Sequence, residues 1–94
     1  MKTSGIHHLV LTVKDVTKSL AFYKQLPNLR IIKQNKDHFI ATDGTITLFI
    51  GEPRDTSTLK NEQFNRNRPG LDHWAFRVSS LKDLKALETH CKKQ

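Results

Sequence analysis

The sequence lacks the features that mark several common protein classes. Cys91 is the only cysteine, which excludes an intrachain disulfide framework and a zinc site built from several cysteines. No stretch approaches the roughly 18 apolar residues that a membrane span needs, and residues 1–5 lead into the first strand pattern without the apolar region of a secretory signal. These absences predict a cytoplasmic protein without a membrane partner.

Acidic residues are also in short supply. Sixteen Lys and Arg stand against nine Asp and Glu, so the formal net charge is +7 at pH 7. An excess of this size can indicate a nucleic-acid partner. The basic residues are scattered along the chain, however, and no basic run carries interleaved aromatic residues for base stacking. The sequence therefore predicts a solvated basic surface and no nucleic-acid partner.

The length limits the apolar surface that the chain can bury. With 94 residues, 36% hydrophobic and 27% charged, it has the composition of one small soluble domain. A chain of this size buries only about 60 to 65% of its unfolded surface, so pairing with another chain would add to a modest stability. A homodimer is therefore expected.

Residues 5–13 alternate between two faces, which predicts a strand. Leu9, Leu11 and Val13 share one face, and we expect them to pack against a helix because they are large and apolar. His8 lies on the opposite face, together with smaller or more polar neighbours.

A helix and three further strands are predicted next. Asp15 can cap a helix over residues 16–24, where apolar residues recur at helical spacing, and Pro27 ends it. The pair Asp43-Gly44 predicts a two-residue hairpin with a mirror-image turn. Residues 51–70 are polar and turn-rich, which predicts a connector. The three strands are expected over residues 29–33, 38–42 and 45–50.

The pattern of residues 5–13 recurs in residues 70–78, at an offset of 65 residues, so that His73 corresponds to His8. A second helix follows, with Ser80 as its cap. A repeat of this length indicates a duplicated module. The second copy ends after its helix, which leaves two explanations open: the chain is a fragment or truncation of a longer protein, or another chain supplies the missing strands.

Three segments carry a family resemblance. They read Gly-Ile-His-His-Leu-Val-Leu-Thr-Val-Lys-Asp at residues 5–15, Ser-Leu-Ala-Phe-Tyr at residues 19–23 and Gly-Leu-Asp-His-Trp-Ala-Phe-Arg-Val at residues 70–78. Together they resemble the vicinal-oxygen-chelate superfamily of glyoxalases, bleomycin-resistance proteins and extradiol dioxygenases.

The resemblance implies an α+β fold, in which paired βαβββ modules form a cup-shaped barrel. Residues 1–94 would be a single domain, and its second module would be incomplete, with only its first strand and its helix present. The parts of this domain would be residues 5–51 as the first module, 52–69 as the connector and 70–94 as the start of the second module.

The resemblance also implies a divalent metal that binds two oxygens of a small substrate. His8 and His73 match the family's ligand positions on the first strands of the two modules. The third ligand, a glutamate on the last strand of the second module, has no counterpart here, and the equivalent position of the first module is assigned to Leu48, which cannot bind metal. Two histidines and a carboxylate suit Mn, Zn, Ni or Fe(II), whereas two histidines alone make a weak, open site.

Three other residues have weaker claims to a role. By strand alternation, His7 is expected to point away from the face of His8. Glu52 could replace the missing carboxylate, although we expect it to be solvated. His38 begins a strand and could line the cup, but it has no supporting partner.

Two functions remain open. One is a metal-dependent enzyme similar to glyoxalase I, ring-cleaving dioxygenases or thiol transferases, in which the ion held by His8 and His73 polarises substrate oxygens. The other is a metal-free protein that binds a small molecule, as bleomycin-resistance proteins do, or an inactive fragment. The histidine pair favours the enzyme, and the missing third ligand favours the binder. No catalytic residue can be named, and the substrate and reaction type stay open.

Overall fold

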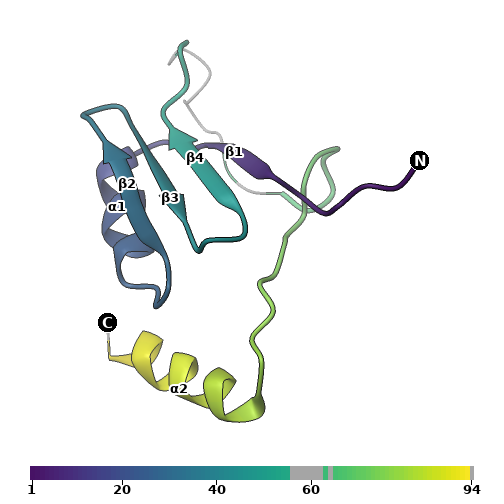
Figure 1. Ribbon diagram of the computed structural model, residues 1–94. Coiled ribbons are helices and arrows are strands. Elements are labelled where there is room, and N and C mark those ends of the chain that lie inside the picture. The colour runs from purple at the N-terminus through teal and green to yellow at the C-terminus, as the bar shows by residue number, and fades with distance from the viewer. Residues whose placement is uncertain (56–62, 64, 94) are drawn as a thin grey trace. The chain divides into compact units, whose positions relative to one another are not determined.

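A computed structural model describes residues 1–55, 63 and 65–93, which fall into two compact units divided at residues 56 and 57. The predicted α+β class and the βαβββ order of the first module are confirmed (Figure 1). The first unit contains β1 (His8–Thr12), α1 (Val16–Lys24), β2 (Arg30–Gln34), β3 (His38–Thr42) and β4 (Thr47–Gly51), and the second contains α2 (Leu81–Lys92).

The four strands form one sheet in the order β1-β4-β3-β2. β4 runs parallel to β1 and antiparallel to β3, and β2 is antiparallel to β3. Parallel neighbours cannot be joined by a tight turn, so the chain returns from β1 to β4 through α1, β2 and β3. As a result, the first and last strands of the module lie side by side, with His8 opposite Thr47.

The helix α1 lies against one face of this sheet (Figure 1). Leu9 and Leu11 of β1 pack against the core on that face, as the alternation predicted, while Val10 between them is 69% exposed. The predicted face of His8, opposite the core, is therefore confirmed. The buried core consists of Val16, Phe39, Ala41, Leu48 and Ile50, none of them more than 4% exposed.

Both ends of α1 are set by identifiable residues. The N–H of Lys18 donates to Oδ1 of Asp15 at 3.2 Å, which confirms Asp15 as the cap. Beyond the C-terminal end, Asn28 has a φ of 67°. Asparagine tolerates this left-handed conformation better than most residues, and it turns the chain into β2.

The hairpin between β3 and β4 is present, but its turn lies one residue later than predicted. The N–H of Asp43 donates to the carbonyl oxygen of Ile46 at 3.4 Å, so the central residues are Gly44 and Thr45 and not Asp43 and Gly44. Gly44 has a φ of 93°, at the first central position, where one of the two mirror-image turn types needs a positive φ. Oδ1 of Asp43 also accepts the N–H groups of Thr45 at 2.8 Å and Ile46 at 2.9 Å, and this side chain holds the turn closed.

In the second unit the predicted helix is confirmed and the predicted strand is not. The N–H of Asp83 donates to Oγ of Ser80 at 3.1 Å at the start of α2. Residues 71–78, however, form no strand. In the first module β1 is hydrogen-bonded to β4, whereas no strand among the described residues pairs with residues 71–78. Alternation predicts the faces of a strand but cannot supply the neighbour to which its backbone must bond.

Two other expectations concern parts that the structure describes incompletely. The predicted connector, residues 52–69, includes residues 56–62 and 64, which lie outside the described residues. Within the described part of the chain, neither helix is long and apolar enough to cross a membrane.

Candidate functional site

The face of the sheet opposite α1 is the open face of the first unit, because no described helix of that unit covers it. Val10 and Phe49 on this face are 69% and 37% exposed. The strand pairing gives the face an apolar centre with histidines near its two ends. Its residues are His8, Val10 and Thr12 of β1, Thr47 and Phe49 of β4, and His38, Ile40 and Thr42 of β3.

His8 stands at the start of β1 on this open face. Its ring lies edge-on to Phe49, with the two ring centroids 5.4 Å apart. Its Nδ1 lies 2.9 Å from Nδ1 of His7. Among the described residues, no hydrogen-bond partner occupies its Nε2. His8 therefore presents one ring nitrogen to the open side of the sheet.

The prediction that His7 points away from His8 was wrong. β1 begins at His8, so His7 precedes the strand and its side chain does not follow the alternation. The two rings meet edge to face, with centroids 5.2 Å apart. No pattern in the sequence marks this contact, because it depends on the residue at which the strand begins.

His73 lies in the second unit, in the segment that precedes α2, and its side chain is 82% exposed. Its Nδ1 lies 2.9 Å from Oδ1 of Asp72. The other carboxylate oxygen of Asp72 lies 3.8 Å from Nε of Arg66. No described residue donates to or accepts from Nε2 of His73. His8 thus belongs to the first unit and His73 to the second.

Leu48 does not occupy the position equivalent to the third ligand, so that equivalence was wrong, although Leu48 was not expected to bind metal. Leu48 has no exposed surface and faces the core under α1. The β4 residues on the open face are Thr47, which pairs with His8, and Phe49. A shift of one residue along a strand moves a side chain to the opposite face. Neither Thr47 nor Phe49 offers a carboxylate, so β4 still lacks an acidic ligand.

Glu52 is exposed, as the sequence suggested, but one oxygen of its carboxylate also has a partner in the protein. Its Oε2 accepts the N–H of Val16 at 3.0 Å, at the N-terminal end of α1, where the helix dipole favours a negative charge. The parallel pairing of β1 and β4 brings the end of β4 to this helix. The carboxylate is thereby committed to the helix, and the sequence order alone does not reveal this contact.

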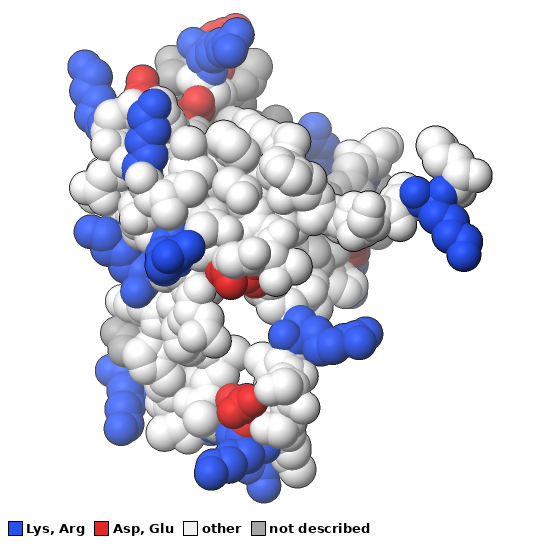
Figure 2. Space-filling model, in the orientation of Figure 1, with Lys and Arg blue, Asp and Glu red and all other residues white. Residues whose placement is uncertain are grey.

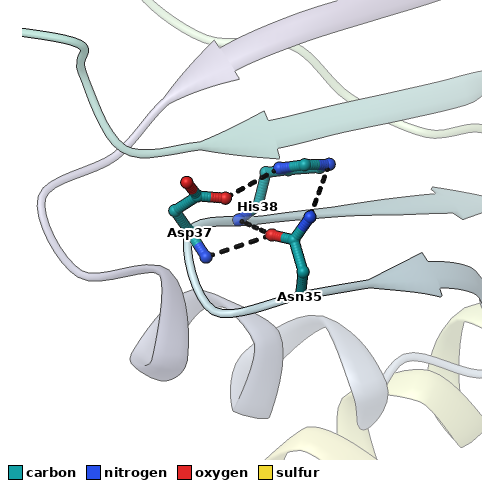
Figure 3. Close-up of polar contacts among 3 residues, drawn as sticks. All are labelled: Asn35, Asp37 and His38. Carbon is teal, nitrogen blue, oxygen red and sulfur yellow. Dashed lines mark hydrogen bonds and ion pairs between the residues drawn. The ribbon is translucent and has the colours of Figure 1, made fainter.

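His38 is held on both sides of its ring, as Figure 3 shows. Its Nδ1 lies 2.9 Å from Oδ1 of Asp37, and its Nε2 lies 3.2 Å from Nδ2 of Asn35. Oδ1 of Asn35 also accepts the backbone N–H groups of Asp37 and His38. These contacts close the turn between β2 and β3 and leave neither ring nitrogen of His38 open to a ligand.

A metal ion would find suitable but incomplete donors. An imidazole with an open Nε2 is a common ligand for Zn, Ni and Fe, and His8 and His73 each offer one. Among the described residues, no group of three or more His, Cys, Asp or Glu side chains could hold a metal ion. The two histidines therefore fit a metal as partial ligands.

The surface charge does not mark a second site on the face in view. In Figure 2, Lys and Arg side chains are dispersed and are separated by uncharged surface. Only small groups of Asp and Glu lie between them. Among the side chains drawn in colour or white there, the cations form no continuous stripe.

Comparisons with known proteins agree with this fold. A family model described as the Glyoxalase/Bleomycin resistance protein/Dioxygenase superfamily matches residues 5–94. The chain is also similar to a crystal structure of a glyoxylase/bleomycin resistance protein/dioxygenase domain from Frankia sp. EAN1pec. That similarity has a TM-score of 0.68 and 29% identity, and it covers 98% of this chain and 74% of the other. A search of the curated proteins gives no match.

Proposed function

Because the chain belongs to the Glyoxalase/Bleomycin resistance protein/Dioxygenase superfamily, we propose that it is a metal-dependent enzyme acting on a small oxygen-rich molecule. The observation that carries the proposal is the position of His8. It lies on the face of the sheet opposite α1, next to Phe49, with Nε2 unoccupied by any described residue. The opposite face of the same sheet is filled by the core.

In this proposal His8 and His73 hold a divalent ion, either Mn, Zn, Ni or Fe(II). When bound, the ion supplies a Lewis acid that polarises oxygens of the substrate. A carboxylate from outside the described residues completes the ligand set. Val10 and Phe49 are exposed on the face of His8, so they provide an apolar surface for the carbon skeleton of the substrate.

Calorimetric titration with Mn, Zn, Ni and Fe(II) tests the metal site. The comparison includes the wild type, His8→Ala, His73→Ala and, as a control, His90→Ala in α2. Each ligand variant should weaken binding by at least about tenfold, whereas the control should bind like the wild type. A wild type that binds none of the four metals, or equal affinity in all four chains, would contradict the proposal.

One observation favours a second function, a metal-free protein that binds a small molecule. The described residues contain no group of three potential metal ligands, yet the open face still carries the exposed apolar side chains Val10 and Phe49. In that case small aromatic ligands would shift the NMR signals of Val10 and Phe49 without added metal. Phe49→Asp would abolish these shifts, and the control Ile32→Asp, at the bulge in β2, would not.

A further inference from the structure

The residue before each proposed ligand contacts the Nδ1 atom of that ligand. Nδ1 of His7 lies 2.9 Å from Nδ1 of His8, and Oδ1 of Asp72 lies 2.9 Å from Nδ1 of His73. His7 and Asp72 occupy equivalent places in the two copies of the repeated segment. In both copies, Nε2 of the histidine has no hydrogen-bond partner among the described residues.

We propose that His7 and Asp72 are positioning residues, which hold His8 and His73 in the tautomer with the proton on Nδ1. A neutral imidazole carries a single N–H, and only its other nitrogen has a lone pair for a metal. With Nδ1 protonated, both histidines present the lone pair on Nε2. This inference rests on the proposed function and specifies which ring atom of each histidine binds the ion.

The assignment is firmest for His73. An ionised carboxylate is only an acceptor, so in the contact with Asp72 the Nδ1 of His73 must be the donor. Carboxylates bonded in this way fix the orientation of metal-binding histidines and raise their basicity. Arg66 adds little to the contact, because its 3.8 Å ion pair with Asp72 is solvent-exposed.

For His8 the partner is a second imidazole, which can donate or accept. If His8 donates from Nδ1, then His7 accepts at Nδ1 and carries its own proton on Nε2. The reverse arrangement would place the proton of His8 on Nε2 and remove the lone pair from the open face. The proposal therefore predicts opposite tautomers for these neighbouring histidines.

The chain contains a third contact of this kind that serves as an internal control. His38 meets Asp37 at the same 2.9 Å, but Nδ2 of Asn35 lies 3.2 Å from its Nε2. A preceding aspartate thus fixes the tautomer in both places, and only His73 keeps an unoccupied Nε2. Asp37→Ala should alter His38 without affecting metal binding.

Long-range ¹⁵N NMR of the imidazole rings tests the proposal on the full chain without metal, at about pH 8. In the wild type, His8, His38 and His73 should carry the proton on Nδ1. Asp72→Ala should move the proton of His73 towards Nε2 and leave His38 unchanged. His7→Phe keeps a ring but removes the acceptor, so it should move the proton of His8 towards Nε2.

Metal titration of the same variants separates this inference from the proposed function. Asp72→Ala and His7→Phe should each weaken binding by about 10 to 100-fold, Asp72→Asn should weaken it less, and Asp37→Ala should match the wild type. A wild-type proton on Nε2 of His73, or wild-type affinity in Asp72→Ala, would overturn the positioning role. Absence of metal binding by the wild type would instead overturn the proposed function.

Discussion

Adjacent residues of β4 serve different purposes because they face opposite sides of the sheet. Leu48 has no exposed surface, whereas Phe49 beside it is 37% exposed. Leu48→Ala should lower the free energy of unfolding by about 2 to 5 kcal/mol, since it leaves a cavity in the core. Phe49→Ala should cost clearly less. Urea denaturation of both variants measures the difference, and equal losses would mean that the faces are assigned wrongly.

The contact of Glu52 with α1 leads to a second prediction. Glu52→Ala removes the acceptor for the N–H of Val16 and should destabilise the fold by about 0.5 to 2 kcal/mol, as loss of a helix cap does. The matched control Glu88→Ala removes only an exposed ion pair with Lys92, usually worth less than about 0.5 kcal/mol.

The same variant tests whether Glu52 could be a metal ligand. Because its carboxylate is bonded to the helix, Glu52→Ala should bind metal with wild-type affinity, as measured by calorimetry at a temperature where the variant stays folded. A tenfold loss of affinity with an unchanged fold would identify Glu52 as the third ligand and contradict its assignment to the helix.

At the scale of elements, Asp43 makes the β3–β4 hairpin sensitive to acid. The backbone N–H groups of Ile46 and Thr45 bond to its carboxylate and hold the pKa of Asp43 below its ordinary value of 3.8. The hairpin therefore gains stability that is present above about pH 4 and is lost as the pH falls through the lowered pKa. Thermal unfolding in that range should show a smaller loss for Asp43→Asn than for the wild type.

If the thermal stability of the wild type and of Asp43→Asn depended equally on pH, the Asp43 carboxylate would not stabilise the hairpin. Asp37→Asn is a suitable control, since the carboxylate of Asp37 bonds to the His38 ring at the β2–β3 turn and contributes nothing to the β3–β4 loop.

Helices and strands were predicted well where the sequence pattern that predicts them is local. The helix over residues 16–24 and the strand over residues 38–42 agree with the structure at both ends, because caps and alternation act over a few neighbouring residues. The turn was placed one residue too early, because Asp43 precedes the two central residues and bonds through its side chain to Thr45 and Ile46. Residues 70–78 have the alternation of a strand but no partner strand among the described residues.

The site was predicted only in part for a related reason. The face of His8 follows from alternation, but the neighbours of a side chain depend on pairing between distant segments. The parallel register of β1 and β4 places Leu48 in the core and brings Glu52 to α1. The local sequence does not contain this register, so it placed Leu48 on the wrong face and did not reveal the hydrogen bond between Glu52 and α1.

At the scale of the whole molecule, the free edge of β1 favours association. β1 pairs with β4 on one side, and the sheet described here has no strand on its other side. An unpaired edge in a small protein invites pairing with another strand. Sedimentation velocity should therefore detect a homodimer, and Val10→Lys, which places a charge on this strand, should shift it towards monomer. A wild type that stays monomeric at all concentrations would contradict this.

The central claim is that His8 and His73 both bind one metal through Nε2. Proton NMR of the Co(II)-loaded chain tests it directly. Each ligating imidazole keeps an exchangeable ring N–H proton close to the paramagnetic ion, and binding through Nε2 and not Nδ1 places its Hδ2 as well as its Hε1 next to the ion. We expect strongly shifted, exchangeable signals from two histidines, one lost in His8→Ala and the other in His73→Ala, with both carbon-bound ring protons of each histidine strongly broadened. Two shifted signals in each variant, or no shifted signal in the wild type, would contradict it.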